Sequence, residues 1–269
     1  MATKTQPCLH AHKGNLFTCI SATGNTVFLS GGLKRPLFVS AAGSAALRIL
    51  MTQSSNNIFE AEYNRVAKRS IDAESVVNAA LAPISLATSF RSPTGGNNLA
   101  DQLQVVARLI AARQPLGVKR QVFMVSMGGF DHHDNLINGH ATLMDQLDFA
   151  LDAFYRSTVE LGVSENVTTF TASDFGRTLQ SNGDGSDHGW GSRHFIIGGA
   201  VNGGRYYGVA PQIAVNTPDQ VGFGRFLPTT AVAQYAATVA IWFGVAPSEL
   251  SSIAPGIGRF ASSNLAFIQ

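Results

Sequence analysis

The sequence has little charge and no basic run, and this shortage excludes a common class of binding protein. Only 13% of the 269 residues are charged, well below the share of about 25% in an average soluble domain. The 19 Lys and Arg residues nearly balance the 17 Asp and Glu residues, so the net charge is +2. A protein that binds nucleic acid usually has a concentrated basic patch, so we expect no nucleic-acid partner.

Cysteine and long apolar runs are also scarce. The two cysteines, Cys8 and Cys19, are too few for a disulfide framework or for a tetrahedral thiolate zinc site. They fit either two free thiols or one disulfide bond. The most apolar stretch, residues 235–245, is much shorter than the roughly 20 residues of a membrane-spanning helix. The first 14 residues are polar and contain no obvious export signal.

Apolar residues make up 45% of the chain, enough for a hydrophobic core, and their spacing predicts the fold class. Apolar runs predict strands at 16–22, 26–29, 121–126, 167–172 and 195–201. Helical spacing predicts helices at 41–53, 56–78, 100–112, 138–161, 229–243 and 247–253. This order of elements is typical of an α/β protein with a mostly parallel sheet and helices on both faces. No repeat or clear boundary is visible, so we expect a single domain over residues 1–269.

Five of the seven histidines lie between positions 131 and 194, mainly in loops that follow predicted strands. Ligands bind at the carboxyl ends of strands in open α/β sheets. The first of these loops contains Asp131 and His133, a carboxylate and an imidazole that suit zinc, manganese or iron. The alternative is that this loop only caps the next helix, with Asp134 or Asn135 at its start.

The second loop, residues 171–178, contains Asp174 where the strand at 167–172 ends, followed by Arg177. The guanidinium of Arg177 can bind an anion through two N–H groups. A structural ion pair between Arg177 and Asp174 is the alternative interpretation.

The third loop, residues 181–195, contains Asp187, His188 and His194 among several glycines. The glycines would allow these side chains to face one point. The alternative is a flexible surface loop with solvated charges, but Trp190 argues against it, because such loops seldom contain a tryptophan beside histidines.

Together the loops offer six candidate metal ligands: Asp131, His133, Asp174, Asp187, His188 and His194. Two-metal hydrolases use mixed Asp and His ligands to polarise a phosphoryl or sulfuryl oxygen. The sequence therefore predicts a site for one or two divalent metal ions, zinc, manganese or similar, with Arg177 as the candidate for binding an anion.

These motifs resemble those of a bacterial family, domain-of-unknown-function family 1501, which is placed with the alkaline phosphatase and sulfatase-like superfamily. The resemblance lies in the segments 128–135, 173–178, 186–191, 198–208, 222–229 and 237–250. One departure is Asp174, which stands where the family usually has Glu.

The resemblance implies an alkaline phosphatase-like three-layer sandwich and hydrolysis of a small-molecule phosphate or sulfate ester. Members typically begin with a twin-arginine export signal, so it also implies a periplasmic or exported protein. The family's first strand end, which would supply a Ser or Thr nucleophile, is missing here, so we expect an N-terminally truncated member and assign no nucleophile. The alternative is a non-catalytic exported protein, metal-binding or structural, that retains the fold.

Overall fold

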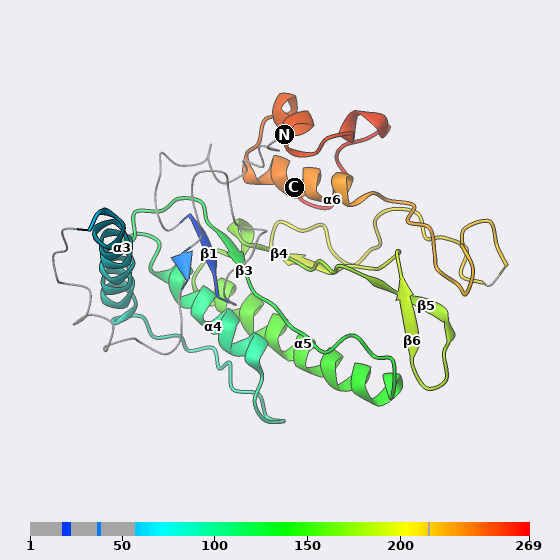
Figure 1. Cartoon of the computed structure of the whole chain (residues 1–269), viewed down its shortest axis with the longest axis horizontal. Helices are drawn as coiled ribbons and strands as arrows, with labels where there is room; N and C mark the ends of the chain where they lie inside the picture. The colour runs from blue at the N-terminus through cyan, green and yellow to red at the C-terminus, as the bar shows by residue number, and fades with distance from the viewer. Residues whose placement is uncertain (1–17, 23–36, 39–56, 215) are drawn as a thin grey trace. The chain divides into compact units, whose positions relative to one another are not determined.

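A computed structural model describes residues 18–22, 37–38, 57–214 and 216–269 (Figure 1). The chain divides into two compact units, one formed by residues 1–89 and 101–126 and the other by residues 90–100 and 127–269. Cys8, the predicted strand at 26–29 and the predicted helix at 41–53 lie outside the described residues. The single domain over residues 1–269 stays a prediction.

The first unit contains a parallel sheet of three short strands. Strands β1 (Cys19–Ser21), β2 (Leu37–Phe38) and β3 (Val122–Met124) are arranged in the order β2-β1-β3, with β1 parallel to both neighbours. Because β1 and β3 are far apart in sequence, a long connection joins them, as parallel pairing requires. Parallel pairing is expected for the predicted α/β class, although the three-layer sandwich itself stays a prediction.

Two helices of the first unit were predicted close to their observed bounds. Helix α3 spans Ile58–Leu81 and α4 spans Asn98–Ala111, with its first residues in the second unit. The Asn57 side chain caps α3, because its Oδ1 accepts hydrogen bonds from the backbone N–H groups of Phe59 and Glu60.

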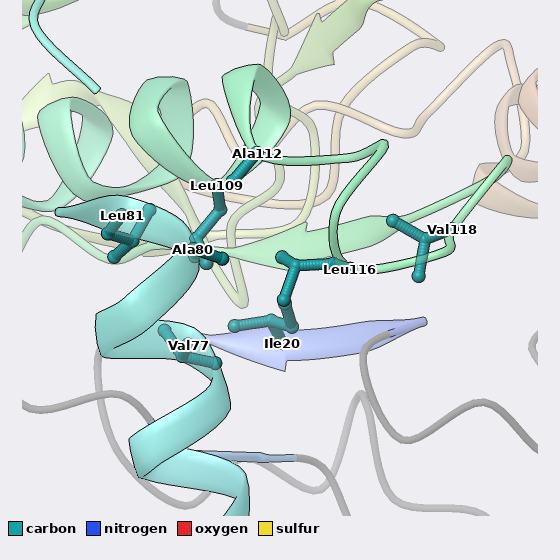
Figure 2. Packing of buried hydrophobic residues seen from close by; sticks show 8 residues of the cluster. All are labelled: Ile20, Val77, Ala80, Leu81, Leu109, Ala112, Leu116 and Val118. Atoms are coloured by element: carbon teal, nitrogen blue, oxygen red, sulfur yellow. The ribbon is translucent and has the colours of Figure 1, made fainter. Parts of the chain in front are cut away.

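A compact apolar cluster joins the helices of the first unit to its sheet. Ile20 of β1 and Leu109 of α4 have no exposed surface, and Val77 of α3 is 1% exposed. Figure 2 shows Ile20 beside Leu116, with Val77 from the neighbouring helix close to them. Burial of these side chains explains why strands of only two or three residues persist, since the sheet alone has few hydrogen bonds.

The amide side chain of Gln102 fixes the end of β3. Its Nε2 donates to the carbonyl oxygen of Ser126, and its Oε1 accepts from the N–H of Ser126, both at 2.9 Å. The amide thus satisfies the backbone of the residue at which the chain leaves the sheet and enters the glycine-containing loop.

The second unit combines helices with two antiparallel strand pairs. Its elements are α5 (Leu136–Glu160), η2 (Ser164–Asn166), β4 (Thr168–Phe170), β5 (Gly176–Ser181), β6 (Ser186–Gly189), β7 (Ile196–Gly198), α6 (Val232–Phe243), η3 (Pro247–Glu249), α7 (Leu250–Ile253) and η4 (Ile257–Arg259). Strand β4 pairs with β7 and β5 pairs with β6, both antiparallel. The strands predicted at 167–172 and 195–201 are therefore present as β4 and β7, and they pair with each other.

The hairpin of β5 and β6 differs from the sequence prediction, which had loops at 171–178 and 181–195. Gly183, at a φ of 140°, lies in the turn between the two strands. Such a φ favours glycine, so the turn can reverse tightly enough for β5 and β6 to pair. Short polar strands of this kind lack the apolar run by which the other strands were predicted.

Helix α5 begins at a residue predicted as its cap, but without the expected side-chain bond. Asn135 is the N-cap, has a φ of 47° and makes no side-chain capping bond. The N–H of Leu136, in the first turn, instead donates to the carbonyl oxygen of Asp184 in the hairpin turn, at 3.0 Å. The other end follows the prediction, because Gly162 has a φ of 65° just beyond the helix.

No described helix is both long and apolar enough to cross a membrane.

Adjacent valines of α3 provide a matched test of the core of the first unit. Val77 is 1% exposed, whereas Val76 is 48% exposed. We expect Val77→Ala to lower the free energy of unfolding by about 2 kcal/mol more than Val76→Ala, because only Val77 leaves a cavity. The change in helix propensity is the same for both and cancels. Urea unfolding measures the difference, and equal effects would show that the cluster does not stabilise the unit.

Candidate metal centre

The site is built where the loop after β3 lies against the β5–β6 hairpin. The N–H of Ser186 in β6 donates to the carbonyl oxygen of His132, at 3.2 Å. Gly185 packs so closely that a Cβ atom on it would lie 2.2 Å from the carbonyl carbon and oxygen of His133. Two segments that are distant in sequence are therefore held together by their backbones, which brings their side chains to one point.

Arg177 of β5 connects these two segments through the hydrogen bonds of its side chain. Its Nη1 donates to Asp131 Oδ1 at 2.8 Å and its Nε to Ser186 Oγ at 3.0 Å. Its Nη2 donates to the backbone carbonyl oxygens of His132 and Ser186. The sequence suggested anion binding or an ion pair with Asp174, but the structure pairs Arg177 with Asp131. Most of its N–H groups are already used within the scaffold.

Three of the six predicted ligands form one cluster. Asp131, His133 and His188 each present a ligand atom, and these atoms all lie within 4.8 Å of one another. The Nε2 atoms of His188 and His133 lie 2.7 and 3.0 Å from Asp131 Oδ1. All three side chains are about half exposed, so the cluster is open to small solutes.

Further contacts hold the two histidines of the cluster in place. The His188 ring stacks on Phe175, with centroids 4.0 Å apart and planes 4° apart. The His133 ring lies 5.3 Å from that of His188, and its Nδ1 is 3.5 Å from Asp187 Oδ1. The Nε of Arg225 donates to the backbone carbonyl oxygen of His188, at 3.3 Å.

Electrostatics favour the charged form of Asp131. Its hydrogen bond with His188 and then that with Arg177 lower its pKa from 3.8 to about 2. The carboxylate therefore stays ionised in mildly acidic solution and provides the negative charge of the cluster, since the other two members are histidines.

The remaining predicted ligands lie outside the cluster. Asp187 faces the far nitrogen of His133, and within the described chain no hydrogen bond or ion pair joins Asp174 to the cluster. His194 has its Nδ1 3.4 Å from Thr171 Oγ1, and its ring stacks on Tyr235. Burial there lowers the pKa of His194 and raises that of Tyr235.

Three residues that shape the site were not singled out from the sequence. Phe175, Gly185 and Arg225 support the cluster by stacking, close packing and a backbone hydrogen bond. Phe175 and Arg225 lie within the segments that carry the family resemblance, and Gly185 lies among the glycines of the third loop. The available sequence signal was that these residues lie within a motif or a glycine-rich loop, and this did not indicate what each residue does.

The three residues of the cluster could hold a small divalent cation. A tetrahedral zinc site with bonds of about 2.0–2.1 Å to its ligands places neighbouring ligand atoms roughly 3.3 Å apart. The separations of 2.7 and 3.0 Å from Asp131 Oδ1 to the two imidazole nitrogens are a little shorter than this value, and all three ligand atoms lie within 4.8 Å of one another. One carboxylate oxygen and two imidazole nitrogens also form a ligand set that zinc and related metals accept.

The described residues form helices, small parallel and antiparallel sheets, and a candidate site for a divalent cation. The chain belongs to a family described as proteins of unknown function, DUF1501, whose model matches residues 43–234. No curated protein and no solved structure matches the chain. The matched region includes all three residues of the cluster.

Gly185→Ala tests whether close backbone packing assembles the site. The new Cβ would overlap the His133 backbone, so we expect the free energy of unfolding to fall by about 1–3 kcal/mol. Gly128→Ala is the control, because a Cβ at Gly128 would meet nothing within 4 Å. Urea unfolding measures the loss of free energy of unfolding in both variants, and an equal loss would contradict the close packing at Gly185.

The lowered pKa of Asp131 predicts a pH dependence in metal-free protein. Because the folded-state pKa is below the unfolded-state value, ionised Asp131 stabilises the fold above about pH 4. This contribution disappears as the pH falls toward 2. A carboxyl-carbon NMR titration in the presence of EDTA should give a pKa of about 2 for Asp131, and a higher value in His188→Ala. A wild-type value near 4 would contradict the hydrogen bonding described.

Proposed function

We propose that this chain binds a divalent metal ion at Asp131, His133 and His188 and hydrolyses a small phosphate or sulfate ester there. The observation that carries the proposal is the convergence of two imidazole nitrogens on one carboxylate oxygen, at 2.7 and 3.0 Å. The proposal includes the alkaline phosphatase-like sandwich, which the parallel sheet of the first unit and the motif resemblance support.

Each residue of the site has a distinct task in this proposal. A divalent cation held here supplies Lewis acidity toward a phosphoryl or sulfuryl oxygen. Asp131 provides negative charge, and Arg177 keeps its carboxylate oriented through Nη1. His133 and His188 provide nitrogen ligands whose rings are already close together. Half exposure of the three side chains lets a small ester reach the cluster.

Arg225 is the residue that we assign to the anionic group of the ester. Its Nε is fixed on the backbone of His188, and its Nη1 makes only a long contact of 3.5 Å to Gly222. The guanidinium lies over the ring of Phe223, and within the described residues its Nη2 makes no hydrogen bond, whereas Nη2 of Arg177 donates to two carbonyl oxygens. Arg225 therefore has more donor capacity for an oxyanion than Arg177.

A non-catalytic metal-binding protein is the second candidate, and one observation favours it. Across the described chain, no hydroxyl side chain bonds to Asp131, His133 or His188. The hydroxyl of Ser186, which is near, accepts a hydrogen bond from Arg177. Among the described residues, then, no hydroxyl is bonded to the cluster as a nucleophile, so turnover would need a water molecule bound to the metal ion.

Metal analysis and an ester assay together test the proposal. After removal of metal with EDTA and dialysis against Zn²⁺ or Mn²⁺, elemental analysis should find about one ion per chain. We expect His188→Ala to weaken binding more than the roughly 10- to 100-fold caused by loss of an outer-shell residue. His140→Ala is the matched control, because His140 contacts the rings of Phe130 and His132 but lies outside the cluster.

Turnover of aryl phosphates or aryl sulfates by the loaded protein, lost in His188→Ala, would support the hydrolase. Stoichiometric metal without turnover of either ester would instead support the non-catalytic protein. Wild-type chain that retains no metal would exclude both candidates.

A further inference from the structure

Asp187 lies beside the cluster, next to the His133 ring. Its Oδ1 lies 3.5 Å from Nδ1 of His133, whereas Nε2 of the same ring lies 3.0 Å from Asp131 Oδ1. The two nitrogens point to opposite sides of the imidazole, so Asp187 faces the side away from the cluster. Consistent with this, Asp187 is not among the three residues whose ligand atoms lie within 4.8 Å of one another.

The Asp187 carboxylate is itself held in position. Its Oδ1 accepts a hydrogen bond from Asn182 Nδ2 at 3.0 Å. Its backbone N–H donates to Oγ1 of the buried Thr178, at 3.1 Å. These contacts come from the hairpin, so the carboxylate is fixed to a different segment of the chain from the histidine that it faces.

We propose that Asp187 is a positioning residue that fixes the orientation and tautomer of His133, and that Asn182 holds the Asp187 carboxylate in place through its hydrogen bond. A carboxylate at Nδ1 favours the tautomer with the proton on Nδ1, and this leaves the Nε2 lone pair free for a cation. Asp131 Oδ1 already accepts from His188 and Arg177, whereas Asp187 Oδ1 accepts one hydrogen bond, from Asn182, so Asp187 has more capacity to accept this proton. The inference rests on the proposed function for the cation, but the arrangement of the ring is independent of it.

The first measurement uses metal-free protein. Long-range ¹H–¹⁵N NMR spectra of the histidine rings, in mildly alkaline buffer where imidazole is neutral, report the tautomer of each ring. We expect the Nδ1–H tautomer for His133 in the wild type and loss of this preference in Asp187→Ala. A wild-type ring with its proton on Nε2, or a spectrum unchanged in Asp187→Ala, would overturn the inference.

The second measurement is zinc affinity, by competition with a coloured chelator. We expect Asp187→Ala to bind zinc about 10- to 100-fold more weakly than the wild type, as is usual for loss of an outer-shell partner. Asp187→Asn should lose less, because the amide oxygen can still accept from Nδ1–H. Asp184→Asn is the matched control, since it removes the same charge from the turn of the same hairpin and should bind zinc like the wild type.

The outcomes separate this inference from the proposed function. If the wild type binds no zinc but His133 has the tautomer set by Asp187, the proposed function fails and the positioning role stands. Equal zinc affinities of Asp187→Ala and Asp184→Asn would overturn the positioning role alone. With Co²⁺ bound, a visible spectrum altered in Asp187→Asn as it is in Asp131→Asn would make Asp187 a ligand and also overturn it.

Discussion

The candidate site depends on the hydrogen bonds that the guanidinium of Arg177 makes. One side chain bonds to Asp131, to the backbone of His132 and to Ser186, and so connects the loop before α5 to the hairpin that contains His188. Its side chain is 21% exposed, less than half the exposure of Asp131 at 56%. A planar group with donors in several directions can hold two segments in fixed register, which a lysine at this position would not do.

Much of the local structure follows from the sequence, because periodicity depends on short-range burial. The helices predicted at 56–78, 100–112 and 138–161 are found as α3, α4 and α5, with ends shifted by a few residues. The strands predicted at 121–126, 167–172 and 195–201 are found, but shorter. Which strands pair was not predictable in this way, since the pairing of β4 with β7 depends on contacts between segments far apart along the chain.

The composition of the site was easier to predict than its arrangement. Residue types and strand ends pointed to Asp131, His133 and His188, which do come together. The same reasoning gave Asp187 and His194 equal weight, because spacing along the chain cannot tell which side of a ring a carboxylate will face. The hairpin of β5 and β6 determines which side of the His133 ring the Asp187 carboxylate faces. The polar strands of this hairpin have no apolar pattern by which they could be recognised.

The openness of the cluster has a consequence for how a cation would be held. Because about half of the surface of each of Asp131, His133 and His188 contacts solvent, water can enter and leave beside the ligands. An ion in such a shell would exchange with the medium instead of being trapped for the lifetime of the fold. Its occupancy would then rise and fall with the free metal in the surroundings, and with it the stability that the bound ion contributes.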